Sequence, residues 1–167
     1  KYSHEGVDIS LVNDEDTLAG HFLHILHGKP PSELHKKVMD TSLILYAEHE
    51  FNASTFTARV CASTMSDIFS CVVAAIGSLR GPLHGGANEA AMDMIENWKT
   101  RDEAKSNILS MLQNKEKIMG FGHAVYSEVD PRNAVIKECS KKLSEEFGDS
   151  TLYEVSEEVE KTMWDEK

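Results

Sequence analysis

Residues 81–88 read GPLHGGAN, the strongest cluster of helix-breaking residues in the chain. Glycine and proline end helices and form turns, so we predict a boundary between two domains at Gly81 and Pro82. On both sides of this cluster, apolar residues such as Leu18 and Phe22 recur every three or four positions. That spacing is typical of helices that bury one face. The sequence therefore predicts an all-α protein.

Capping residues and breakers locate the individual helices. Asp14 is predicted to cap a helix that ends at Gly28, and Ser32 to start one that runs towards His49. Asp67 should cap the next apolar helix. Two further helices are predicted over residues 53–64, which are mostly small, and over 88–98. The capping box Thr100-Arg101-Asp102-Glu103 should open another helix, and a loop follows over 114–130. The last two predicted helices run from Asp130-Pro131 to Gly148 and onward from Ser150.

Two of these helices carry informative apolar patterns. The helix from Ile68 to Leu79 is apolar on nearly all sides, so it should be buried or form a subunit interface. The last helix has one apolar stripe, formed by Leu152, Val155, Val159 and Met163, opposite glutamates and lysines. That second pattern predicts an outer helix whose charged face is solvated.

Composition excludes several classes of protein. Apolar residues make up 41% of the chain and the net charge is −11. No apolar run approaches the roughly 20 residues of a membrane span, and the acidic balance disfavours nucleic acid or an anionic membrane as partner. Cys61, Cys71 and Cys139 form no CxxC pair. They are expected to be buried thiols of a cytoplasmic, reducing compartment.

Both ends of the chain resemble cuts in a longer protein. The sequence opens on Lys1 and Tyr2 without an initiator methionine, and its first residues match neither a secretory nor a transit-peptide pattern. It stops at Lys167 within a helical pattern that has no glycine or proline after it. We expect the natural protein to continue past both ends.

The eight histidines fall into different groups. His21, His24 and His27 are spaced by three, drift round a helix and have no cysteine or carboxylate at metal-ligand spacing, so packing or exposure is preferred and no metal site is predicted. His49, His84 and His123 each lie where a helix should end or a glycine-rich turn should begin. Turns present side chains to clefts, so these last three are the candidates for chemistry.

A neutral imidazole donates from one ring nitrogen and accepts at the other, so it can stabilise an enolic oxygen or deliver a proton near pH 7. The helix opened by Gly85-Gly86 and Asn88 directs free N–H groups at the turn, which favours a neutral His84. Arg132, at the start of a helix, could hold a carboxylate bidentately. Its alternative is a surface ion pair with Glu128 or Glu138.

Nucleotide-binding classes are disfavoured. Gly120-Phe121-Gly122 has no strand before it and no Lys-Ser or Lys-Thr ending. It therefore matches neither a Rossmann nor a P-loop fingerprint.

Three segments together, in this order and separation, resemble the citrate synthase family. They are Ala47-Glu48-His49-Glu50-Phe51-Asn52-Ala53-Ser54-Thr55, then Gly81 to Asn88, and Gly120-Phe121-Gly122-His123-Ala124-Val125-Tyr126 with Asp130-Pro131-Arg132. The resemblance extends over essentially the whole chain. It implies an all-helical fold in which residues 1–81 are part of a large domain and residues 82–167 an incomplete small domain.

The resemblance also implies an activity and roles for single residues. Members of the family are at least homodimers that condense oxaloacetate with an acyl-CoA; the coenzyme A thioester is a co-substrate and no cofactor is tightly bound. His84 would hydrogen-bond the thioester carbonyl and stabilise the enol, and His123 would polarise the ketone of oxaloacetate. His49 and Arg132 would bind oxaloacetate.

Further residues follow from the same resemblance. Coenzyme A would contact Lys117, Ile118, Met119, Gly120 and Phe121. The aspartate that serves the family as general base would lie beyond Lys167, and Asp165 does not match it, so this chain is expected to be an incomplete catalyst.

The acyl group is left open between two candidates. Residues 45–49, Asp130-Pro131-Arg132-Asn133 and Met163-Trp164 resemble the branch of the family that forms 2-methylcitrate from propionyl-CoA, with acetyl-CoA and citrate as the alternative. One methyl group gives a pocket only about 1–3 kcal/mol of discrimination. A hypothesis from another class is a non-catalytic helical dimerisation module built on residues 68–79.

Overall fold

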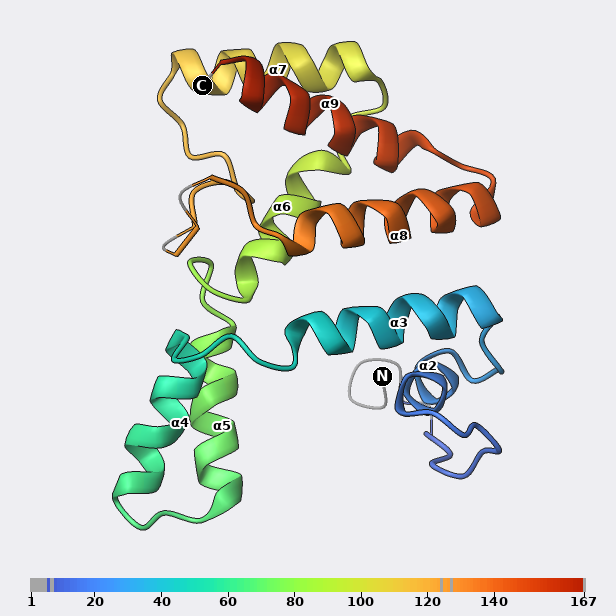
Figure 1. The fold of residues 1–167 in the computed structure, drawn as a ribbon, viewed down its shortest axis with the longest axis vertical. Helices are drawn as coiled ribbons and strands as arrows, with labels where there is room; N and C mark the ends of the chain where they lie inside the picture. The colour runs from blue at the N-terminus through green and yellow to red at the C-terminus, as the bar shows by residue number, and fades with distance from the viewer. Residues whose placement is uncertain (1–5, 7, 124, 127, 167) are drawn as a thin grey trace. The chain divides into compact units, whose positions relative to one another are not determined.

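A computed structural model describes residues 6, 8–123, 125, 126 and 128–166. Within that part of the chain the regular structure consists of eight α-helices and no strand, which confirms the all-α prediction (Figure 1). Ala124 of the third family segment lies outside the described residues. The helices are α2 (Leu18–His27), α3 (Glu33–Tyr46), α4 (Ala53–Ser63), α5 (Ile68–Leu79), α6 (Gly86–Ile95), α7 (Arg101–Gln113), α8 (Arg132–Phe147) and α9 (Thr151–Asp165).

The chain divides into two compact units. The first contains Lys1–Glu48 and Pro131–Leu143, and the second contains His49–Asp130 and Ser144–Lys167. The domain boundary predicted at Gly81 and Pro82 concerns the architecture of the whole protein and stays a prediction.

In the first unit, α2 packs on α3. The Ser32 hydroxyl accepts a hydrogen bond from the N–H of His35 at 3.1 Å, as predicted for a helix cap. The cap of α2 was predicted wrongly: the Thr17 hydroxyl, not Asp14, accepts from the N–H of Gly20 at 2.9 Å. Gly28 ends α2 in the left-handed conformation with φ 72°.

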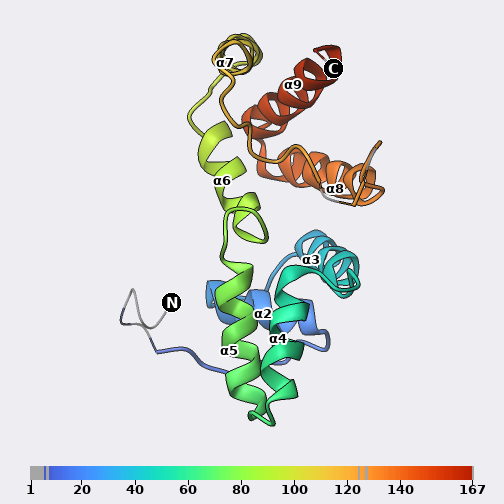
Figure 2. The same ribbon diagram turned by 90° about the vertical axis from the view of Figure 1, so that its left-hand side faces the viewer.

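In the second unit, α4 and α5 form an antiparallel helix pair that is visible side by side in Figures 1 and 2. Asp67 caps α5 as predicted, because its carboxylate accepts from the N–H of Ser70 at 3.0 Å and from the Ser70 hydroxyl at 2.7 Å. These bonds from Ser70 lower the pKa of Asp67. Within the described residues, Cys71 is the buried side chain of α5.

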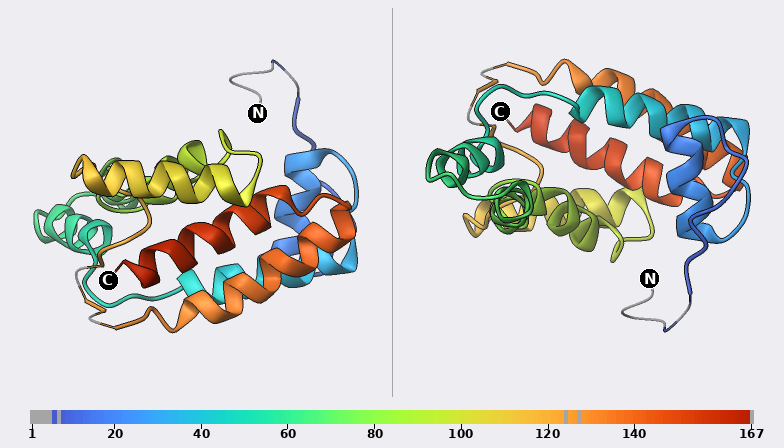
Figure 3. Two further views of the ribbon diagram at one scale, coloured as in Figure 1. Left: turned by 90° about the horizontal axis from the view of Figure 1, so that it is seen from above. Right: turned by 90° about the horizontal axis from the view of Figure 1, so that it is seen from below.

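The core of the second unit lies where α7 meets α9 (Figure 3). Ile108 and Val155 are fully buried, and Ala104, Ile118 and Val159 complete the cluster. Met94, Ile95 and Trp98 from α6 and the residues after it pack against this core. Half of the predicted capping box is present, since the Thr100 hydroxyl accepts from the N–H of Glu103 at 3.2 Å. The Glu103 carboxylate accepts from the N–H of Lys99 at 2.7 Å, one residue before the cap residue itself.

The charged face of α9 is less solvated than predicted. Glu158 is only 8% exposed, and Arg101 at the start of α7 lies 2.7 Å from the Glu157 carboxylate and 3.8 Å from that of Glu158. The stripe is also shorter than expected, because Leu152 is exposed whereas Val155 and Val159 are buried. The glutamates of α9 therefore join α7 to α9 through Arg101 and raise the pKa of Arg101.

A loop connects α7 to α8 and carries the glycines predicted for it. Gly120 and Gly122 have φ values of 95° and 79°, the left-handed region that glycine tolerates. Across the residues that the structure describes, no helix is long and apolar enough to cross a membrane.

Candidate active site

The turn that carries His84 needs glycine at its two following positions. A Cβ on Gly85 would lie 2.5 Å from Leu79 Cδ1 and 2.8 Å from the Leu79 carbonyl oxygen, and one on Gly86 would collide with the carbonyl oxygen of Arg80. The His84 N–H donates to the Gly81 carbonyl at 2.9 Å. The chain thus doubles back tightly after α5, and this turn fixes the start of the His84 side chain.

His84 reaches the first turn of α4. The backbone N–H of Ser54 donates to His84 Nε2 at 3.2 Å, and the Ser54 hydroxyl oxygen lies 2.8 Å from the same nitrogen. A backbone N–H can only donate, so Nε2 accepts and the proton of the neutral ring is on Nδ1. The sequence prediction that the N–H groups at the start of α6 favour a neutral His84 stays a prediction; the backbone donor to its ring comes from α4.

Asn52 organises the same helix start. Its side-chain oxygen accepts from the N–H of Thr55 at 3.0 Å and lies 2.8 Å from the Ser54 hydroxyl, whose single proton serves either Asn52 or His84 Nε2 at one time. This cap holds Ser54 where it meets His84. Asn52 and Ser54 lie within the first family segment, but sequence reasoning assigned them no role.

His123 is held by the backbone that follows it. Its Nδ1 accepts from the N–H of Val125 at 3.1 Å and, more weakly, from that of Tyr126 at 3.5 Å. The neutral ring therefore carries its proton on Nε2. The side chain of His123 is exposed, so Nε2–H is available as a donor.

The structure brings His49 and His123 together. Their ring centroids are 5.4 Å apart, and the ring of Tyr126 lies 4.7 Å from that of His123 and 5.8 Å from that of His49. His84 joins them indirectly, because Ser54, its partner, and His49 belong to the same short segment at the start of α4. His49, His123 and Tyr126 thus form a ring cluster, and the sequence prediction assigned no role to Tyr126.

Arg132 is described within the first unit. It is the first residue of α8 and half-buried, and its guanidinium carbon lies 5.5 Å from the centre of the Tyr46 ring. An arginine over a tyrosine face is a cation–π contact, which restricts the orientation of the guanidinium. Glu138, one alternative partner, is paired with Lys142 at 2.5 Å, and Lys142 lowers its pKa.

The predicted coenzyme A segment is anchored by one side chain. Ile118 is buried in the α7–α9 core, Met119 is half-buried, and Lys117 and Phe121 are exposed. A Cβ on Gly120 would lie 3.6 Å from that of Ala91. The burial of Ile118 fixes the loop and leaves its neighbours at the surface.

Two histidines of α2, His21 and His24, lie near polar side chains. His21 Nδ1 lies 3.1 Å from the Asn13 oxygen and His24 Nδ1 lies 3.7 Å from the Glu15 carboxylate. Throughout the described ranges, no three histidine, cysteine, aspartate or glutamate side chains form a group that could hold a metal ion.

The chain is similar to curated enzymes over most of its length. It is 63% identical to the 2-methylcitrate synthase of Shewanella oneidensis over 167 residues, which is 100% of this chain and 44% of that protein. It is 46% identical to the citrate synthase of Deinococcus radiodurans over 161 residues, 96% of this chain and 43% of that protein. The chain thus spans less than half the length of these relatives.

Solved structures share the arrangement of helices. The citrate synthase of Thermotoga maritima superposes with a TM-score of 0.84 at 36% identity and covers 99% of this chain and 45% of its own. A citrate synthase of Thermoplasma acidophilum, solved as a ternary complex with carboxymethyl coenzyme A and oxaloacetate, gives the same TM-score of 0.84 and 36% identity over 89% of this chain and 40% of its own.

The family model for the citrate synthase C-terminal domain matches residues 1–167. The chain therefore belongs to the citrate synthase family.

Proposed function

We propose that the whole protein to which this chain belongs is a 2-methylcitrate synthase, which condenses propionyl-CoA with oxaloacetate and releases coenzyme A. The observation that carries this proposal is the pair of fixed ring nitrogens: His84 Nε2 accepts from Ser54 and His123 Nδ1 accepts from Val125. Each ring then offers one N–H to a substrate oxygen. The 63% identity with the Shewanella enzyme supports the choice of reaction.

The first step is enolisation of the thioester. His84 donates its Nδ1–H to the thioester carbonyl oxygen, where negative charge develops as a base removes a proton from the α-carbon. Following the family resemblance, that base is an aspartate of the whole protein that lies outside this chain. We propose for this reason that the 167 residues alone do not turn over.

The second step forms the carbon–carbon bond. The enol carbon attacks the ketone carbon of oxaloacetate, and His123 donates its Nε2–H to the ketone oxygen, which becomes the hydroxyl of the product. Water then hydrolyses the thioester and releases coenzyme A. Both histidines act as neutral donors, so neither needs to be charged before the reaction.

Other residues bind the two substrates. His49 and Arg132 each bind oxaloacetate, and the planar guanidinium of Arg132 can meet a carboxylate with two parallel hydrogen bonds. Residues 117–121 contact coenzyme A, where Gly120 lets its backbone approach closely. No tightly bound cofactor takes part in these steps.

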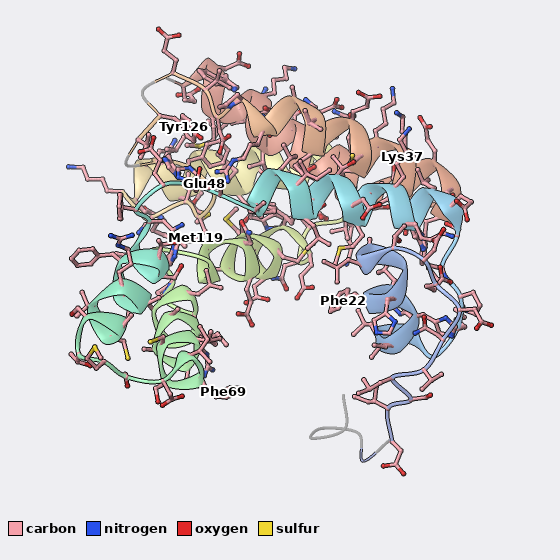
Figure 4. The ribbon with its side chains drawn as sticks, turned by 60° about the horizontal axis from the view of Figure 1, so that its bottom comes forward. Phe22, Lys37, Glu48, Phe69, Met119 and Tyr126 are labelled. Atoms are coloured by element: carbon pink, nitrogen blue, oxygen red, sulfur yellow. The ribbon has the colours of Figure 1, made fainter. Side chains whose placement is uncertain are left out.

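The α4–α5 pair is proposed as a homodimer interface. Phe69 is 79% exposed and Val73 68% exposed within this chain; Figure 4 labels Phe69 near the end of α5 that leads into the α4–α5 loop. A run of large exposed apolar side chains on one helix pair is typical of a surface that a partner covers. We propose that the dimer is cytoplasmic, as the unpaired cysteines indicate.

Two other functions deserve a test. Citrate synthesis from acetyl-CoA is the first, because one methyl group changes pocket affinity by only about 1–3 kcal/mol. The second is a non-catalytic dimerisation module, which the exposed apolar face of α5 favours. The module predicts self-association without any binding of oxaloacetate or coenzyme A.

The test uses the full-length protein with propionyl-CoA and acetyl-CoA as alternative substrates. His84→Ala and His123→Ala should each lower kcat by about 10²- to 10⁴-fold, the usual contribution of a positioned proton donor. His27→Ala is the matched control, because His27 is an exposed histidine at the end of α2. Unchanged turnover in both variants would refute the proposed function, and higher kcat/KM for acetyl-CoA would assign citrate synthesis instead.

A further inference from the structure

Tyr126 touches both histidines of the ring cluster. Its hydroxyl lies 3.3 Å from His49 Nε2, and its ring lies 4.7 Å from that of His123, inclined by 34°. Its backbone N–H also points at His123 Nδ1, at 3.5 Å. Figure 4 labels this tyrosine in the loop between α7 and α8. One residue therefore contacts two rings that come from different parts of the chain.

The hydroxyl contact determines what His49 can offer a ligand. A phenol can donate or accept, but a carboxylate can only accept. If His49 binds a carboxylate through Nδ1–H, then Nε2 of the neutral ring must accept, and the Tyr126 hydroxyl is the donor at 3.3 Å. With a carboxylate on Nδ1, the Tyr126 hydroxyl thus favours the Nδ1–H tautomer and holds the orientation of the ring.

The ring of Tyr126 restricts the orientation of His123. The Val125 N–H already holds His123 Nδ1 at 3.1 Å, and the face of Tyr126 restricts rotation of the imidazole about its χ angles. Tyr126 is half-buried and is not part of the α7–α9 core cluster. Its removal should leave that core intact.

We propose that Tyr126 is a positioning residue that holds His49 through its hydroxyl and His123 through its ring. This inference rests on the proposed condensation, in which His49 binds oxaloacetate and His123 protonates its ketone. The two contacts are chemically separable, because phenylalanine keeps the ring and lacks the hydroxyl, whereas leucine lacks both.

The kinetic test compares these two substitutions in the full-length protein. Tyr126→Phe should raise KM for oxaloacetate by about 3- to 10-fold, the loss expected for one neutral hydrogen bond, with kcat and the KM for acyl-CoA within about twofold. Tyr126→Leu should in addition lower kcat by at least about tenfold, because His123 loses the ring that orients it. Tyr126→Phe keeps the ring, so its kcat should stay close to that of the unchanged protein.

Tyr153→Phe is the matched control. The Tyr153 hydroxyl donates to the Glu157 carboxylate at 3.2 Å, a bond of nearly the same length on the half-buried face of α9. Its loss should leave both KM values unchanged. An equal rise in oxaloacetate KM for Tyr153→Phe and Tyr126→Phe would overturn the proposal, since the effect would then be general loosening.

A second measurement does not depend on turnover. In protein labelled with ¹⁵N only at histidine, solid-state NMR should show the His49 ring-nitrogen signals, assigned by loss in His49→Asn, change in Tyr126→Phe and stay fixed in Tyr153→Phe. Unchanged His49 signals in Tyr126→Phe would overturn the positioning role even in an active enzyme. Changed signals in a protein that condenses neither acyl-CoA would support the contact and refute the proposed function.

Discussion

The α7–α9 pair and the α4–α5 pair bury their apolar side chains to very different degrees, although both consist of two packed helices in the same unit. Between α7 and α9, Ile108 and Val155 are 0% exposed. On α5, Ile76 is 58% exposed and Val73 68% exposed, and Cys71 is the buried residue. The first pair completes its core within this chain, and the second leaves its apolar surface open.

The difference shows that the apolar composition of a helix does not by itself decide how deeply the helix is buried. The sequence of α5 is more apolar than that of α7, yet α7 contributes more side chains to the core. Burial of a helix depends on what packs against it and not on its hydropathy alone. An apolar helix without cover in its own chain implies cover from elsewhere. A second copy of the protein is the occupant that we propose.

The largest expected effect is in the closed core. Ile108→Ala should lower the free energy of unfolding by about 2–5 kcal/mol, because it removes a fully buried side chain and leaves a cavity. Denaturant titration of the full-length protein measures this loss. Ile76→Ala is the matched change on α5, and it should cost clearly less at low protein concentration; an equal loss there would mean that α5 is packed within one subunit.

An intermediate effect is expected at the open face of α5. Val73→Glu should raise the dimer dissociation constant by at least about 100-fold, since an unpaired carboxylate would be buried between the subunits. Sedimentation velocity over a range of concentrations measures the change, with Val73→Leu as the apolar control. A dimer that tolerates glutamate at this position would remove α5 from the interface.

The smallest expected effect concerns Cys71, the buried side chain of the open pair. Burial, followed by the neighbouring Cys61 thiol, raises the pKa of the Cys71 thiol. A raised pKa leaves less thiolate at pH 8, so Cys71 should react with iodoacetamide at least about tenfold more slowly than Cys139, which is half-buried. Mass spectrometry of tryptic peptides after timed labelling would reveal equal rates if α4 and α5 separated readily.

Local signals predicted much of the fold. Ser32, Asp67 and Thr100 each cap a helix as their position before an apolar run predicted. The prediction that Asp14 caps α2 was wrong because Thr17, three residues later, offers an equivalent side-chain oxygen. The cap pattern alone does not choose between the two residues. The burial of Glu158 was missed because the pattern of α9 contains no information about Arg101, its partner on α7.

The sequence identifies the three candidate histidines but not the groups that contact them. His49, His84 and His123 stand at breaks in helical pattern, which sequence can detect. The Tyr126 hydroxyl and His49 Nε2 are 77 residues apart in the chain, and the Ser54 N–H and His84 Nε2 are 30 apart. No local periodicity reports such contacts, because they depend on how the helices meet.

We propose that His84 and His123 each present one fixed N–H to a different substrate oxygen. The direct test is a crystal structure of the full-length protein with oxaloacetate and carboxymethyl coenzyme A, the pair of molecules bound in the Thermoplasma relative. We expect His84 Nδ1 to lie within about 3.2 Å of the carboxymethyl oxygen that stands for the thioester carbonyl, and His123 Nε2 to lie equally close to the ketone oxygen. Both ligands bound with either imidazole turned away from its oxygen would contradict it.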